Sequence, residues 1–291
     1  MPAKKPSTPA KSLSRQPRLH NRSKETVKKS IASGMELANL FPRFRNGAHV
    51  TQTSTALTFD LAEATKHLAE RDECLKRLIE EALPFQIDIA DAQSPYEALL
   101  ESIAYQSISG KAAATIFGRI KALSGNGRAP APEQMLKLRK PVLRKAGLSG
   151  AKVLAMKDLA QKTIEGIVPS LEEAQKLSDE ELVKRLVSVR GIGAWTVEMF
   201  LIFRLGRPDV LPIHDLGVKK GWSVTYGKKH MPKPQQLLAF GERWRPYRTV
   251  ASWYMWRAFE RAGYATTNKI RPARVRKPSK RTKQKRRSKK L

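Results

Sequence analysis

The chain has 291 residues, enough for one large or two small domains, and its 56 Lys and Arg against 26 Asp and Glu give a net charge of +30. Its single cysteine, Cys74, excludes a disulfide framework and a four-cysteine metal cluster. No apolar run approaches the roughly 18 residues of a membrane-spanning helix, so neither a transmembrane span nor a membrane partner is expected.

The positive charge is concentrated at the two ends of the chain. Residues 1–50 carry a net +9 and residues 268–291 a net +13, which leaves +8 for residues 51–267. Because such segments are too polar to form a core, we predict a mostly disordered basic arm over residues 1–58 and a disordered basic tail over residues 268–291. Basic side chains that neutralise phosphates give salt-dependent affinity, so nucleic acid is the expected partner. For the tail, nuclear targeting and solubility predict the same composition.

Apolar residues recur at helical spacing from Asp60 onward. Asp60 is the expected N-cap of the first helix, and Ser178 caps a later one. In chain order, the pattern predicts helices over residues 61–83, 95–109, 111–123, 133–138, 141–146, 151–165, 179–188, 194–205, 214–222, 235–244 and 248–262. No strand-like alternation of any length is present, so the predicted fold class is all-α.

The sequence VRGIG at residues 189–193 joins two of these predicted helices. Two glycines around an isoleucine permit a tight turn and leave the backbone N–H groups uncovered. Such amides at the start of a helix bind phosphate. The hairpin therefore predicts backbone contacts to nucleic acid by Arg190, Gly191, Ile192 and Gly193, although a solvated face is the alternative for the Arg190 side chain.

Asp215 follows this hairpin by about two dozen residues and is surrounded by apolar neighbours. By itself it could simply cap the helix that starts there. Cleavage of an N-glycosidic bond, however, develops positive charge on the sugar, which a nearby carboxylate stabilises. The hairpin upstream favours this second interpretation.

Four stretches together resemble the helix-hairpin-helix DNA glycosylases (the HhH-GPD superfamily), in particular the 3-methyladenine DNA glycosylase II branch. The stretches are PYEALLESIAYQSISGKAA at 95–113, GIGAWT at 191–196, PIHDLGVKKG at 212–221 and RTVASWYMWRA at 248–258. The resemblance covers roughly residues 60–265 and implies one glycosylase domain over residues 59–267. It further implies two helical subdomains with the active cleft between them, a middle one over about 96–211 and a second from about 60–95 plus 212–265.

The resemblance also implies roles for individual residues. Asp215 becomes the catalytic carboxylate. Aromatic and soft side chains that prefer a flat cationic base would line its pocket, with core packing as the alternative for the tryptophans; they are Trp195, Met199, Tyr254 and Trp256.

DNA contacts outside the hairpin follow from the same resemblance. Gln106 and Ser107 fall at a turn where relatives carry a glutamine and a wedge, although a serine fills a vacated base stack poorly. Gln106 could equally be a helix-terminal cap. Apart from the resemblance, Lys219 is expected to contact phosphate as Arg190 does, with a solvated charged face as the alternative. The backbone carbonyls of three hairpin residues correspond to those that hold a structural Na⁺ or K⁺; they are Val187, Val189 and Gly191.

Trp195 decides the expected reaction type. Lyase relatives carry a Schiff-base lysine at this position, and an indole cannot act as one. We therefore predict a monofunctional glycosylase that flips out alkylated purines of the 3-methyladenine type and hydrolyses them from DNA, the first step of base excision repair. It needs no cofactor and acts as an intracellular monomer on damaged double-stranded DNA, in the bacterial nucleoid or the eukaryotic nucleus. The alternatives are a non-catalytic DNA-binding protein and a glycosylase for a different damaged base.

Overall fold

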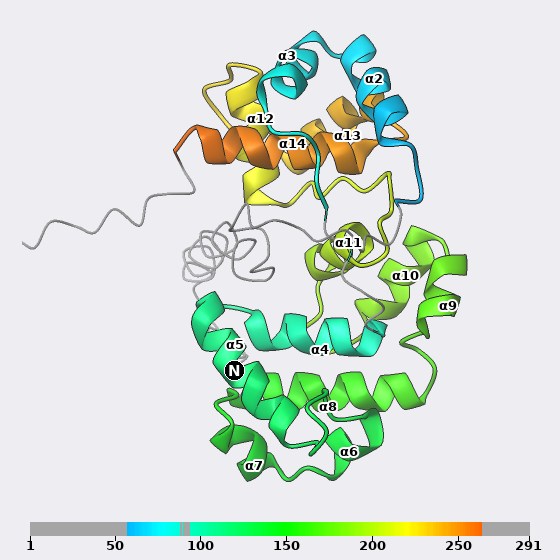
Figure 1. The fold of residues 1–291 in the computed structure, drawn as a ribbon, viewed down its shortest axis with the longest axis vertical. Coiled ribbons are helices and arrows are strands. Elements are labelled where there is room, and N and C mark those ends of the chain that lie inside the picture. The colour runs from blue at the N-terminus through cyan, green and yellow to red at the C-terminus, as the bar shows by residue number, and fades with distance from the viewer. Residues whose placement is uncertain (1–56, 88, 90–93, 264–291) are drawn as a thin grey trace, which may run out of the picture.

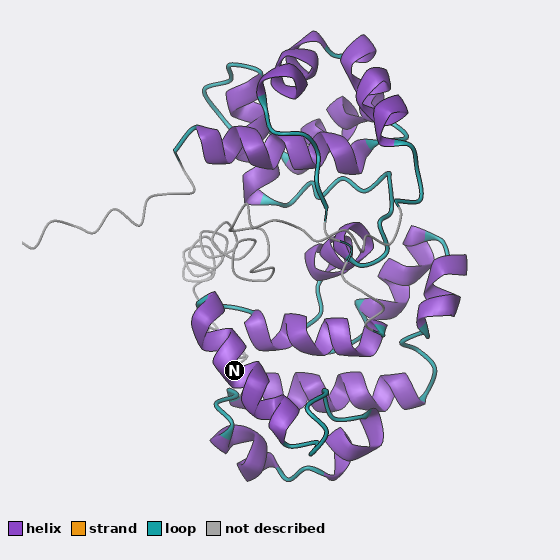
Figure 2. Cartoon of the chain, viewed as in Figure 1, coloured by secondary structure: helices purple, strands orange, loops and turns teal. Residues whose placement is uncertain are grey.

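The computed structural model describes residues 57–87, 89 and 94–263. Apart from residues 57–58, the predicted basic arm lies outside this range, as does the predicted basic tail. Within the described residues the chain forms helices joined by loops and contains no strand, which confirms the all-α prediction (Figure 2). In the same residues, no helix has the length and apolar character needed to cross a membrane.

The helices follow one another along the chain with short connections. They are α2 (Leu61–Arg71), α3 (Glu73–Glu81), α4 (Pro95–Tyr105), α5 (Gly110–Ala122), α6 (Pro132–Lys137), α7 (Lys140–Lys145), α8 (Gly150–Ile164), α9 (Leu171–Lys176), α10 (Asp179–Leu186), α11 (Ala194–Phe203), α12 (Leu216–Thr225), α13 (Pro234–Gly241), the 3₁₀ turn η2 (Glu242–Trp244) and α14 (Arg248–Arg261).

These helices pack as two groups, which lie at opposite ends of the view in Figure 1. In one group α14 packs along α12 and also contacts α2 and α3, so the first and last described segments come together. In the other, α8 packs against α4, α6 and α7. Helix α11 packs on α10 and α4 and lies between the groups. The exact bounds of the two predicted subdomains remain a prediction.

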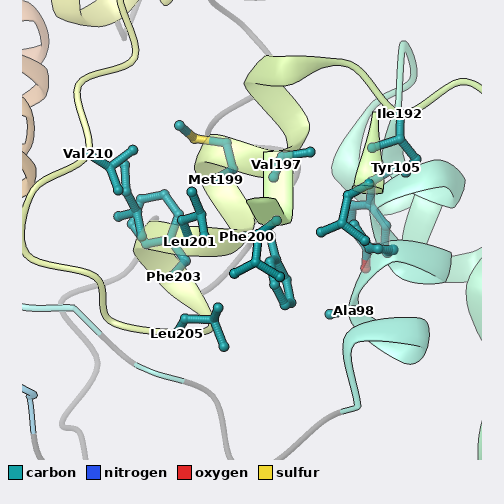
Figure 3. Packing of buried hydrophobic residues seen from close by; sticks show 14 of the residues in the cluster. Ala98, Tyr105, Ile192, Val197, Met199, Phe200, Leu201, Phe203, Leu205 and Val210 are labelled. Atoms are coloured by element: carbon teal, nitrogen blue, oxygen red, sulfur yellow. The ribbon is translucent and has the colours of Figure 1, made fainter. Parts of the chain in front are cut away.

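Helix α11 is apolar on nearly every side, because it lies inside the protein rather than on its surface. Seven of its ten residues are buried. Phe200 extends toward Ala98 of α4, whereas Leu201 and Phe203 pack near Val210 of the segment that leads to α12 (Figure 3). Helix α11 is thereby fixed against both its own group and the connection to the other group.

The single helix predicted over residues 61–83 is wrong, because Asp72 divides it into α2 and α3. Asp72 has an extended backbone and caps α3, with Oδ1 accepting a hydrogen bond from Leu75 N at 3.1 Å. Its Oδ2 accepts hydrogen bonds from the Tyr226 hydroxyl at 2.6 Å and from Trp244 Nε1 at 3.2 Å. These tertiary hydrogen bonds stabilise the break between α2 and α3, and helical periodicity alone does not predict them.

Asp72→Ala is expected to lower the free energy of unfolding by about 3 kcal/mol, because a buried donor, Trp244, and a half-buried donor, Tyr226, lose a charged acceptor. Chemical denaturation of the full-length chain measures this loss. Asp60→Ala is the matched control, since Asp60 caps α2 from an exposed position and makes no tertiary bond in the described residues. A loss at Asp72 no larger than at Asp60 would contradict the tertiary role.

Two other helix predictions also need correction. Helix α9 was not predicted; Ser170 and Glu173 begin it with reciprocal side-chain hydrogen bonds to each other's backbone N–H. The helix predicted from residue 214 begins at Leu216, because Asp215 has extended backbone angles and is its N-cap.

Candidate active site

Asp215 lies at the start of α12, where the connection from one helix group enters the other. Its Oδ1 accepts a hydrogen bond from Val218 N at 2.7 Å, so the carboxylate does cap the helix. The side chain is almost fully enclosed, with the residue 1 % exposed. A carboxylate at this position also benefits from the positive end of the helix dipole.

Two indole N–H groups, one from each helix group, converge on the same carboxylate. Trp195 of α11 donates from Nε1 to Oδ2 of Asp215 at 2.8 Å, and Trp256 of α14 donates from Nε1 to Oδ1 at 2.9 Å. A carboxylate offers about four acceptor positions. The backbone N–H groups of Val218 and Gly217 also donate to this carboxylate, so protein donors surround a side chain that is almost fully enclosed.

Burial and hydrogen bonding act on Asp215 in opposite directions. Burial raises the pKa of this carboxyl group above its ordinary value, and the hydrogen bonds from Trp256, Val218 N and Trp195 partly offset the rise by stabilising the anion. The two tryptophans therefore help to keep a buried negative charge in place. They also fix the orientation of the carboxylate.

Trp195→Phe is expected to slow any reaction that needs ionised Asp215 by roughly tenfold to a hundredfold. This factor corresponds to the free energy that a hydrogen bond to a charged group contributes. Loss of this donor also raises the pKa of Asp215, so the acid limb of the pH–rate profile moves to higher pH. The measurement is the single-turnover rate as a function of pH. Trp253→Phe is the control, because Trp253 donates to the Gln86 carbonyl at 3.0 Å instead. An unshifted acid limb in Trp195→Phe would contradict the assignment.

An apolar and aromatic set surrounds the Asp215 carboxylate. Trp195, Met199 and Phe203 follow one another at four-residue steps and so share a face of α11. The Phe203 ring stacks on Trp256 with centroids 5.6 Å apart and an interplanar angle of 26°. Met199 and Trp256 are buried. Three of the four residues predicted for the base pocket thus lie together.

Tyr254, the fourth predicted pocket residue, lies elsewhere. It is two positions from Trp256, which places it about 200° around α14. Its ring packs edge-on against Trp253, with centroids 5.0 Å apart, and its hydroxyl interacts with the backbone of Phe85. The structure therefore does not bring Tyr254 to Asp215.

The glycine-rich hairpin is held in shape by α8. Gly191 has φ +79°, a conformation that favours glycine. Asp158 of α8 accepts a hydrogen bond from Arg190 N at 2.7 Å, and Lys162 bonds both Asp158 and the carbonyl of Ser188. Burial opposes ionisation of Asp158, but the bonds from Arg190 N and Lys162 outweigh it and hold the pKa of Asp158 below its usual range.

Several backbone N–H groups of the hairpin have no hydrogen-bond acceptor among the described residues. Arg190 N is bound to Asp158, and Ile192 N donates to the Val189 carbonyl at 3.0 Å. Among the described residues, no acceptor bonds the amides of Gly191, Gly193 or Ala194, and Gly193 is an N-cap without a side-chain acceptor. The geometry thus leaves these amides, at the N-terminus of α11 and just before it, for an anionic ligand.

The predicted DNA contacts at Gln106 and Ser107 lie beside this hairpin. Gln106 donates from Nε2 to the Gly191 carbonyl at 3.0 Å, so its amide connects the end of α4 to the hairpin. Ser107 is exposed at the following turn with φ 60°, a backbone region that a serine rarely adopts. Lys219 lies one turn along α12 from Asp215 and is partly exposed.

Three residues near the site were missed in the sequence. Phe203 could have been found from the four-residue spacing with Trp195 and Met199. Glu198 could have been found more easily, because it is the one charged residue in the otherwise uncharged sequence of α11. Asp158 had none, since its contact with the hairpin joins residues 32 positions apart.

Comparison with known proteins identifies the family of the chain. The sequence profile of the HhH-GPD superfamily of base excision DNA repair proteins matches residues 100–246. The chain is similar to DNA-3-methyladenine glycosylase 1 of Schizosaccharomyces pombe, with 38 % identity over 213 residues, 73 % of this chain and 92 % of that protein.

Two solved structures are similar as well. The S. pombe 3-methyladenine DNA glycosylase in complex with abasic DNA matches with a TM-score of 0.61 and 39 % identity, over 67 % of this chain and 95 % of that one. A DNA-3-methyladenine glycosidase from Bacillus halodurans matches with a TM-score of 0.64 and 31 % identity, over 72 % of this chain and 94 % of that one.

Proposed function

Because the chain belongs to the HhH-GPD superfamily of base excision DNA repair proteins, we propose that it is a DNA glycosylase that releases alkylated purines of the 3-methyladenine type from DNA. The observation that carries this proposal is the buried carboxylate of Asp215 held by the indoles of Trp195 and Trp256. A helix cap alone would need neither indole.

In the proposed reaction the bond between the base and C1′ of the deoxyribose breaks as positive charge develops on the sugar. Asp215 stabilises that charge as a fixed anion in a site with little water, where electrostatic effects are large. Water then adds to C1′ and gives up its proton to the Asp215 carboxylate as the C1′–O bond forms. The products are the free base and an abasic site.

A single carboxylate suffices because alkylation at a ring nitrogen makes the purine cationic, so it leaves without a general acid. Selection of such a base would rest on rings that attract a flat cation. Trp195, Met199 and Trp256 are the proposed lining, and Phe203 supports Trp256 from one face. Tyr254 is left out of the proposed lining, because its described contacts are with Trp253 and Phe85 instead.

We assign the enzyme hydrolytic activity without lyase activity, on the ground that the indole of Trp195 cannot form a Schiff base with the sugar. Borohydride trapping during base release tests this assignment, with a bifunctional 8-oxoguanine glycosylase as the positive control. The expected result is a trapped adduct for the control and none for this protein. A borohydride-dependent covalent complex with this chain would overturn it.

The DNA backbone is the proposed ligand of the three uncommitted hairpin amides, with Arg190 and Lys219 adding phosphate contacts and Gln106 and Ser107 facing the distorted duplex. A structural Na⁺ or K⁺ would be held by the carbonyls of Val187, Val189 and Gly191. Val189 and Gly191 carbonyls each accept one hydrogen bond and keep a second lone pair, so they fit such an ion. The ion would supply positive charge beside a phosphate.

We further propose that the protein acts as a monomer on double-stranded DNA containing damaged bases, in the compartment that holds that DNA.

A further inference from the structure

A second carboxyl group, Glu198, lies close to Asp215 and has no part in the reaction described so far. It follows Trp195 by three residues on α11, so both side chains lie on neighbouring positions of one helix face. Its Oε2 atom is buried and has no hydrogen-bond partner in the described part of the chain. An unpaired buried carboxyl oxygen is costly and calls for an explanation.

Glu198 lines a cavity of about 400 Å³ between α10, α11, the segment before α12 and the start of α14. Asp215 does not line this cavity, but its negative charge acts on Glu198. The charged groups around it are Asp179, Glu180 and Lys184 of α10, Asp209 before α12, Arg248 of α14 and Asp215 itself.

The two aspartates of this cavity each have an arginine beside them, although Asp179 Oδ1, like Glu198 Oε2, makes no hydrogen bond in the described residues. Asp209 accepts a hydrogen bond from Arg248 Nε at 2.7 Å, and Asp179 lies 3.3 Å from Arg207 Nε. Glu198 has no such cation. Burial raises the pKa of Glu198 to about 7, and the negative charge of Asp215 contributes to the rise. The charge of Glu198 therefore changes near pH 7.

We propose that Glu198 is a positioning residue of the active site, which acts through Asp215 by changing the negative potential at the reacting sugar. The proposal rests on the glycosylase function proposed above. With Glu198 neutral, Asp215 is the one negative charge at the site. With Glu198 ionised, a second charge adds to the field that stabilises the cationic sugar, and base release becomes faster.

The test is the single-turnover rate of base release from methylated duplex DNA between pH 6 and 8, with enzyme in saturating excess so that DNA affinity does not enter. For the wild type we expect the rate to rise about tenfold across this range, the size of effect that corresponds to one pKa unit. Glu198→Gln is expected to lack this rise and to remain near the low-pH rate of the wild type. Glu198→Asp, which keeps a carboxyl group, is expected to retain a rise.

Glu180→Gln is the matched control, because Glu180 lines the same cavity but is exposed. It is expected to show the wild-type profile. A Glu198→Gln profile that parallels the wild type, or a wild-type rate that is flat between pH 6 and 8, would overturn the proposal. Absence of base release by the wild type at every pH would instead count against the glycosylase function.

A stability measurement separates this role from a purely structural one. Because the folded-state pKa of Glu198 is raised, its contribution to stability is present at low pH and is lost as the pH rises through about 7. Glu198→Gln should therefore gain thermal stability relative to the wild type between pH 5.5 and 8.5. An equal Tm difference at both pH values would show that Glu198 does not titrate there, which contradicts the proposal.

Discussion

Asp215→Asn is expected to lower the single-turnover rate of base release by at least about a thousandfold, an effect of about 4 kcal/mol on the barrier. The substitution keeps the size of the side chain and its ability to accept from Val218 N, so α12 retains its cap. It removes the negative charge that stabilises the cationic sugar. It also places an amide N–H opposite an indole donor, since both oxygens of Asp215 accept from tryptophans.

The measurement compares wild-type and variant rates on methylated duplex DNA, together with the Kd for undamaged DNA and the Tm. The hairpin amides and basic surface are untouched, so DNA binding should remain within a fewfold of the wild type. A rate within tenfold of the wild type, with the fold intact, would mean that Asp215 is a helix cap and no more.

Gly221→Ala is expected to have the largest effect on stability, because α12 and α14 touch there through their backbones. A Cβ atom at Gly221 would lie 1.8 Å from the carbonyl oxygen of Met255, far inside van der Waals contact. The two helices must move apart, and overpacking of this kind costs about 3 kcal/mol or more. Since α12 carries Asp215 and α14 carries Trp256, the shift should also disturb their hydrogen bond.

Denaturant titration measures this loss, and Gly118→Ala is the matched control. Gly118 lies inside α5, and a Cβ there would meet nothing within 4 Å. Alanine at an exposed helix position should raise the free energy of unfolding by about 0.5–1 kcal/mol. Equal effects of the two substitutions would show that the α12–α14 contact is looser than described.

Much of this fold could be predicted because its helices are amphipathic and begin at polar caps. Asp60 and Ser178 cap helices where the sequence predicts them. The break at Asp72 could not be predicted, since its cause is a pair of donors more than 150 residues away, Tyr226 and Trp244. Helix α9 has six residues, fewer than two turns, so periodicity gives it little signal; its sequence signal is the reciprocal cap of Ser170 and Glu173.

The sequence could propose candidate site residues by their chemical type. It could not show in which direction each side chain points from its helix. Asp215 and Trp195 are singled out by the resemblance to the family together with the hairpin upstream, and their roles stay a prediction. Tyr254 and Trp256 are nearly adjacent in sequence and equally aromatic, yet opposite faces of α14 give them different surroundings. The indole hydrogen bonds to Asp215 depend on three helices meeting, which no local pattern encodes.

Base release by the wild-type chain from methylated duplex DNA tests the central claim most directly. The released bases are separated by chromatography, and strand integrity is followed before and after alkali. The account predicts free 3-methyladenine, with strands that stay intact until alkali cleaves the abasic sites. Intact DNA binding without release of any methylated purine would contradict it and favour a DNA-binding protein or a glycosylase for another lesion.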